Sequence, residues 1–103
     1  MGTSKRYAHV VDARMDERIL RQIAESGPLQ NLTAEELELD RMALAVDPFP
    51  KPVRARVRFG NTPVQVNAVA VRWTTQAVGV EFTIGGKTYR CWVWRGAVTD
   101  RDD

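Results

Sequence analysis

The chain has 103 residues, with 15 lysine or arginine, 13 aspartate or glutamate, one cysteine and a formal net charge of +2. Its 44% hydrophobic and 27% charged residues are typical of one globular domain and exclude a wholly disordered chain. No apolar run approaches the roughly 20 residues that span a bilayer, and the single cysteine excludes an intrachain disulfide and is typical of a cytoplasmic protein. Abundant arginine, alanine and valine, with few lysines, indicate a GC-rich bacterial genome.

The small net charge conceals an uneven distribution along the chain. Residues 1–50 carry six basic and nine acidic side chains, a net of −3, whereas residues 51–98 carry eight basic and one acidic, a net of +7. The tail, residues 99–103, has a net of −2. This asymmetry indicates a polyanionic partner for the basic half. The alternative is that the acidic half packs against the basic half and neutralises it.

The first half of the chain carries two helical signatures after a flexible N-terminus, residues 1–11. The first helix is predicted for about residues 12–26, because Asp12 can act as its N-cap and because apolar residues recur on one face. That face consists of Met15, Ile19 and Ile23. We expect a second helix from the region of Thr33 to residue 46, so that residues 12–46 form a helical hairpin.

The second helix has the clearest local signature. Thr33 and Glu36 have the spacing of a capping box, and Leu32 and Leu37 occupy the positions of a hydrophobic staple. An apolar stripe at helical spacing continues the pattern. It is formed by Leu39, Met42, Ala43 and Val46.

Residues 47–52 alternate proline with other residues, which predicts a stiff, extended connector. From Val53 onward the hydrophobic pattern has a period of two, which predicts four strands in a β region, residues 53–98, before the acidic tail, residues 99–103. A change of phase near Asn67 predicts a bulge or corner. The fold class is therefore α+β, with the helical hairpin packed on a four-to-five-stranded, strongly bent antiparallel sheet. In architecture alone this resembles a small SH3-like barrel, which implies no function.

One face of the predicted sheet combines small side chains with large aromatic ones. A two-residue Gly-Gly turn sets the register of the last two strands so that Gly79 faces Trp92. The preceding loop makes Arg72 oppose Gly79 and Ala70 oppose Glu81. The predicted face comprises Ala68, Ala70, Ala77, Gly79, Trp92, Trp94, Arg72 and Arg90.

This face has three interpretations. The two helices cover it, or it binds nucleic acid by stacking bases on the tryptophans and holding phosphates with the arginines. The third interpretation is that the face is a protein–protein or homodimer interface, because tryptophan and arginine are the commonest residues at interface hot spots.

A second candidate site is the row formed by Arg54, Arg56 and Arg58. Alternate positions of a strand point the same way about 6.5–7 Å apart, which suits a run of phosphates. The alternative is that these charges prevent edge-to-edge aggregation of an exposed strand.

The sequence lacks the signature of an enzyme. His9 is the only histidine and has no cysteine or histidine at metal-binding spacing. Cys91 falls on the predicted core face, which favours an inert buried thiol over a nucleophile. Consecutive placement spreads the carboxylates of residues 35–40 around a helix, so they favour a solvated face over a catalytic pair. We expect no enzymatic activity, no cofactor and no metal.

These observations predict a small non-catalytic binding module that contacts nucleic acid through its basic β region. The candidate residues are Arg54, Arg56, Arg58, Arg72, Arg90, Trp92 and Trp94. The alternative is a protein–protein interaction or structural accessory domain that uses the tryptophan-rich face, including as a homodimer. A membrane partner is not expected.

Overall fold

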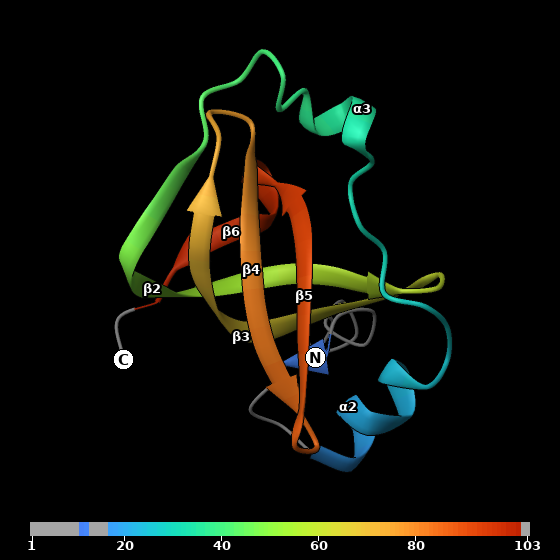
Figure 1. Cartoon of the computed structure of the whole chain (residues 1–103). Helices are drawn as coiled ribbons and strands as arrows, with labels where there is room; N and C mark the ends of the chain where they lie inside the picture. The colour runs from blue at the N-terminus through green and yellow to red at the C-terminus, as the bar shows by residue number, and fades with distance from the viewer. Residues whose placement is uncertain (1–10, 13–16, 102–103) are drawn as a thin grey trace, which may run out of the picture.

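The computed structural model describes residues 11–12 and 17–101 (Figure 1). Two helices precede most of the sheet, α2 (Glu17–Ala24) and α3 (Ala34–Leu37). The strands are β1 (Val11–Asp12), β2 (Ala45–Phe59), β3 (Thr62–Trp73), β4 (Ala77–Ile84), β5 (Lys87–Trp94) and β6 (Val98–Asp100), with a short 3-10 helix, η2 (Arg95–Ala97), before β6. The protein is therefore a small α+β protein, as the sequence predicts.

Five strands form one antiparallel sheet in the order β5-β4-β3-β2-β6, and β1 pairs in parallel with β3. β2 and β3 are long and curve around the core, while β4 and β5 cross in front of them (Figure 1). The order begins at β5 and ends at β6, so the sheet is open, and the expected SH3-like barrel is not confirmed. No helix among the described residues has the length and apolar composition needed to cross a membrane.

The register of the β4–β5 hairpin is the predicted one. Gly79 pairs with Trp92, and Glu81 pairs with Arg90. The register could be predicted because the local turn sets it. Gly85 and Gly86 adopt φ values of 58° and 81°, which a two-residue hairpin turn requires and which glycine adopts without strain.

The register of the β3–β4 hairpin is only partly the predicted one. Arg72 opposes Gly79 as expected, but Ala70 opposes Val80 instead of Glu81, because the register shifts between Ala70 and Arg72. The irregularity lies there and not at Asn67 as predicted. Each strand residue faces the side opposite to its neighbour, so a shift of one residue exchanges the two faces. Ala68 and Ala70 are accordingly buried in the core, and their predicted place beside the tryptophans is wrong.

The core lies on the inner face of the curved sheet. At its centre, the ring of Phe59 meets the rings of Phe82 and Tyr89 edge-on, with centroids 6.4 and 5.4 Å apart. Cys91 belongs to this core, as predicted, and burial raises the pKa of its thiol to about 11. The thiol therefore stays protonated near neutral pH, which is the state of an unreactive cysteine.

α2 packs at the turn between β4 and β5. Its buried residue is Leu20, and Ile23 and Ala24 pack partly against the core, whereas Ile19 is 37% exposed. The predicted apolar face is thus wrong at Ile19, and Met15 lies outside the described residues. Glu17 accepts a hydrogen bond from the backbone N–H of Gly85, which holds the helix against the hairpin turn.

α3 begins as predicted but ends after one turn. Thr33 and Glu36 form both bonds of the capping box, yet the helix ends at Leu37 and the next residue, Glu38, has a φ of 50°. The chain soon becomes β2, because Ala45 and the residue after it pair with β3. These nonlocal hydrogen bonds override the helical periodicity, and the predicted helical hairpin is not confirmed.

The proline-rich residues 47–52 are extended, as predicted, and lie within β2. The carbonyl groups of Pro52 and Arg58 accept hydrogen bonds from Arg101 and Gln30, so the even-numbered residues between 52 and 58 direct their backbone away from β3. A proline at such a position removes no donor from the β2–β3 ladder, because its missing N–H would face the outer edge.

Residues 28–32 connect the two sides of the open sheet. The N–H groups of Gly60 and Gln30 bond the carbonyls of Pro28 and Arg58 at 2.7 and 2.8 Å. Farther along the same segment, the N–H of Leu32 bonds the carbonyl of Trp92 at 3.2 Å. The segment therefore holds the end of β2 at a fixed position relative to β5.

We expect a Gly27→Ala substitution to destabilise the protein by about 1–3 kcal/mol. A Cβ atom at Gly27 would lie 2.7 Å from the Cα and 2.9 Å from the backbone nitrogen of Gly60, and backbone cannot yield as a flexible side chain can. Urea unfolding followed by circular dichroism measures the change. Gly96→Ala is the matched control, because no atom lies within 4 Å of its added Cβ. Equal losses in both variants would contradict the close approach.

Candidate functional site

A groove of about 500 Å³ lies between β2 and β5, where the sheet is open. Residues 30–32 border it on one side, and Ala97 of η2 also lines it. We call this cavity the β2–β5 groove. Its lining includes four of the residues that the sequence singles out, namely Arg56, Arg58, Trp92 and Trp94.

The tryptophan wall of the groove comes from β5. Trp92 and Trp94 alternate with the core residue Val93, so strand geometry places both indoles on the outer face, about 7 Å apart along the strand. The backbone N–H of Trp92 donates to Oδ1 of Asn31 at 2.6 Å, which fixes this position of the strand edge. Trp94 is 44% exposed, although its indole is the largest aromatic side chain and gains most from burial.

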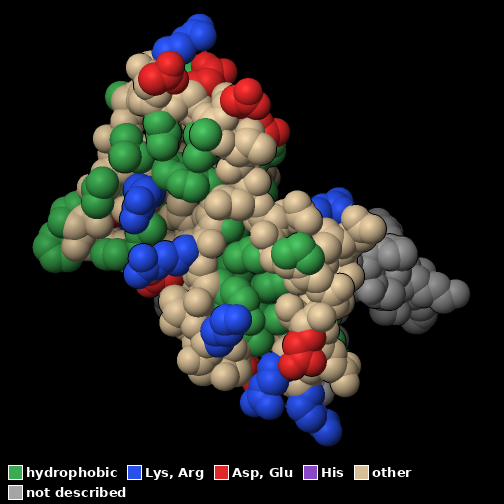
Figure 2. Space-filling view, turned by 45° about the vertical axis from the view of Figure 1, so that its right-hand side comes forward, with side chains coloured by type: hydrophobic (Ala, Val, Ile, Leu, Met, Phe, Trp, Pro, Cys, Tyr) green, Lys and Arg blue, Asp and Glu red, His purple; other side chains and the backbone are tan. Residues whose placement is uncertain are grey.

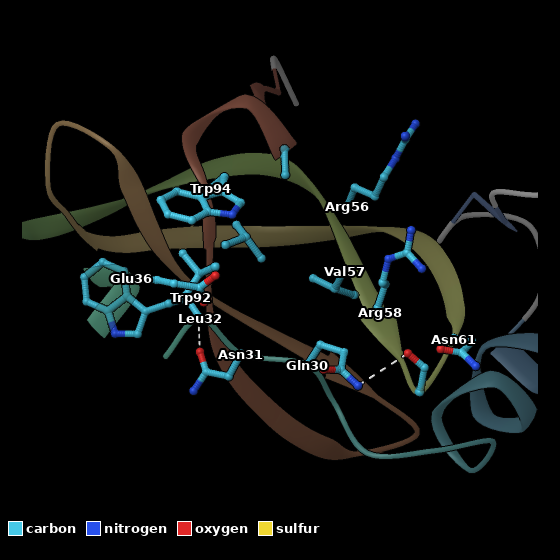
Figure 3. Close-up of a pocket in the computed structure, with 13 residues that line it drawn as sticks. Gln30, Asn31, Leu32, Glu36, Arg56, Val57, Arg58, Asn61, Trp92 and Trp94 are labelled. Atoms are coloured by element: carbon cyan, nitrogen blue, oxygen red, sulfur yellow. Dashed lines mark hydrogen bonds between the residues drawn. The ribbon is translucent and has the colours of Figure 1, made fainter. Parts of the chain in front are cut away.

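The basic wall comes from β2. Arg56 and Arg58 alternate with Val57, which is buried, so both guanidinium groups point outward and both side chains are exposed. Figure 3 shows them extending from β2 on one side of the groove, with Trp92 and Trp94 on the other side. Each wall therefore repeats one kind of side chain at the same interval of two residues.

Arg54, the third arginine of the predicted row, does not line the groove. It is half-buried opposite Thr99 of β6, and its Nε is buried with no hydrogen-bond partner among the described residues. Arg54 lies in the part of β2 that pairs with β6, outside the lining of the groove. Sequence alternation alone could not reveal this, because the pairing is nonlocal.

Arg72 and Arg90 lie around a second, smaller hollow of about 200 Å³ on the outer face of β4 and β5. Trp92 and Asn31 line both this hollow and the β2–β5 groove. The predicted neighbourhood of Arg72, Arg90 and Trp92 is thus present. Trp94 lines the groove but not the hollow.

The two helices leave Trp94 44% exposed, so the interpretation that they shield the whole of this face is wrong at Trp94, whereas Trp92 is half-buried. α2 packs at the far turn of the β4–β5 hairpin, and α3 contributes only Glu36 to the rim of the groove. Sequence reasoning missed the contributions of Gln30 and Asn31, since no pattern marks these polar residues between two helical segments.

Acidic side chains gather at the end of the molecule that carries α3 (Figure 2). The segment that contains α3 carries Glu35, Glu36, Glu38 and Asp40. The ion pair between Arg90 and Glu81, at 2.6 Å, joins two residues within the β region and does not link the acidic half of the chain to the basic half. Arg56 and Arg58 are exposed on the groove wall, and Glu36 is the one acidic side chain among the residues that line the same groove.

Within the described residues, no three histidine, cysteine, aspartate or glutamate side chains are grouped as metal ligands would be. His9 lies outside those residues. Cys91 is buried with a raised pKa, so its place in the core accounts for it without a chemical role.

The fold and the groove together define a small α+β protein with an open, five-stranded antiparallel sheet and an aromatic and basic groove at the opening. No known protein family, curated protein or solved structure matches the chain.

Proposed function

We propose that the protein is a non-catalytic binding module that holds single-stranded nucleic acid in the β2–β5 groove. The observation that carries the proposal is that Trp92 and Trp94 face the same cavity as Arg56 and Arg58. Nonspecific single-strand binding surfaces combine these two elements, an aromatic platform for the bases and a basic wall for the backbone.

The spacing of the two walls suits a polymer with a repeating unit. The two indoles and the two guanidinium groups each recur at an interval of about 7 Å along their strands. Stacking contributes about 1–3 kcal/mol per base, and each arginine can neutralise a phosphate. A ligand that alternates flat apolar rings with phosphates satisfies both walls at once.

The geometry favours a single strand over a duplex. An indole can stack only on a base whose face is open, and in a duplex the faces are covered by neighbouring base pairs.

One observation favours a second candidate function, which is the binding of an extended peptide. The even-numbered residues of β2 between 52 and 58 direct their backbone away from β3, and β5 is the first strand of the sheet. Residues 28–32 already bond Arg58, Gly60 and Trp92, and β6 covers residues 53–55 of β2, so an added strand, from another protein or from a second copy of this chain, would pair with the remaining edge of β5. The charge and aromatic pattern of the side chains favours the first candidate.

Tryptophan fluorescence titration with an oligothymidylate, and with an abasic strand of equal length, tests the proposal. We expect saturable binding at low salt, and about 30-fold weaker binding of the abasic strand, because it offers phosphates but no bases for the two indoles. Trp73 lines a different cavity and gives a constant background signal. Absence of binding at low salt, or equal binding of the two strands, would overturn the proposal.

A further inference from the structure

The β2–β5 groove does not end at Trp92. Trp92 and Asn31 form part of the lining of both the groove and the second hollow, so the two cavities lie on either side of one strand edge. The hollow contains two further basic residues, Arg72 and Arg90. A ligand that leaves the groove over the indole of Trp92 therefore meets a second pair of positive charges.

Gly79 is the residue that lets Arg72 reach this hollow. A Cβ atom at Gly79 would lie 2.8 Å from Cγ of Arg72, so the stem of Arg72 crosses β4 in space that any other residue would fill. Arg72, Gly79 and Trp92 stand in register across three neighbouring strands, with backbones about 5 Å apart from strand to strand. The glycine thus directs a basic side chain toward the aromatic one.

Arg90 stands on the same strand as Trp92, two residues away. Its Nε–H donates to Oε2 of Glu81 at 2.6 Å, while the side chain is 71% exposed. The bond occupies one of the five N–H donors of the guanidinium group and orients the rest. The ion pair therefore presents Arg90 at the rim of the hollow in a defined direction.

We propose that this hollow is a second phosphate-binding subsite for the same nucleic-acid strand, formed by Arg72 and Arg90 across the floor at Gly79. This inference rests on the proposed function and adds to it the path of the ligand. The strand runs from Arg56 and Arg58, over the two indoles, to the hollow. The protein therefore distinguishes strands by length, because only a longer strand reaches both pairs of arginines.

The test compares an oligothymidylate of about four nucleotides with one of about twelve, which spans the range of single-strand site sizes. In an Arg72→Gln/Arg90→Gln variant we expect about 3- to 30-fold weaker binding of the long strand and unchanged binding of the short one. The salt dependence of the long strand should also fall by about 1.4 in log–log slope. The Arg56→Gln/Arg58→Gln variant is the contrasting control, because it should weaken both strands.

Gly79→Ala provides a second variant that keeps every charge. It displaces the stem of Arg72 and should weaken the long strand selectively, with thermal unfolding used to confirm that the variant is folded. Equal losses for both strands, or no loss for either, would overturn the second subsite while the wild-type protein still binds the short strand. Failure of the wild-type protein to bind either strand would instead overturn the proposed function.

Discussion

Replacing Trp94 by alanine should weaken the binding of an oligothymidylate by about 5- to 150-fold, which corresponds to the loss of one stacked base. Trp94 is 44% exposed and lines the β2–β5 groove, so its removal deletes a platform without opening the core. Fluorescence anisotropy of a labelled strand measures the affinity directly and does not depend on the tryptophans.

The matched control for this substitution is Leu44→Ala. Leu44 is 47% exposed, nearly the same as Trp94, but it does not line the groove. We expect unchanged affinity for this variant, and a partial return of affinity for Trp94→Phe, because phenylalanine keeps a smaller aromatic face. An affinity loss of equal size in the leucine variant would show that Trp94 acts through general surface hydrophobicity and not through stacking.

The second large effect is expected for the double substitution Arg56→Gln/Arg58→Gln. Both side chains are exposed on the wall of the groove, so each one can neutralise a phosphate of a bound strand. Binding should weaken by about 3- to 30-fold at low salt. The slope of log affinity against log salt should become shallower by about 1.4, since each phosphate contact on a single strand contributes about 0.7.

The control is the double substitution Lys51→Gln/Lys87→Gln, which removes the same net charge at exposed positions that do not line the groove. A general electrostatic attraction would weaken equally in both double variants. A groove that contacts phosphates directly loses slope only in the arginine variant. Identical slopes in the two variants would therefore contradict the placement of the phosphates along β2.

Several features of the fold could be predicted from the sequence because they depend on neighbouring residues. The turn at Gly85 and Gly86 sets the β4–β5 register, and the capping box of Thr33 and Glu36 forms as its spacing requires. The burial of Cys91 follows from the alternation within its own strand. Each of these features is decided within a few residues along the chain.

Other features could not be predicted because they depend on pairing between distant segments. The predicted helix to residue 46 does not form, because Ala45 and Val46 pair with β3 although the apolar spacing is helical. The shift between Ala70 and Arg72 moves two alanines from the outer face to the core. In both cases nonlocal hydrogen bonds and burial outweigh a local preference of well under 1 kcal/mol per residue.

The same distinction between local and nonlocal features applies to the candidate site. The recurrence of arginines along β2 and of tryptophans along β5 could be predicted from the sequence, as could the concentration of positive charge in residues 51–98. The folded arrangement was needed to show that Arg56 and Arg58 share a groove with Trp92 and Trp94, and that Arg54 lies outside it, beside β6. Side-chain alternation is a property of each strand alone, whereas the opening between β2 and β5 exists only once the sheet has curved and been bridged by residues 28–32.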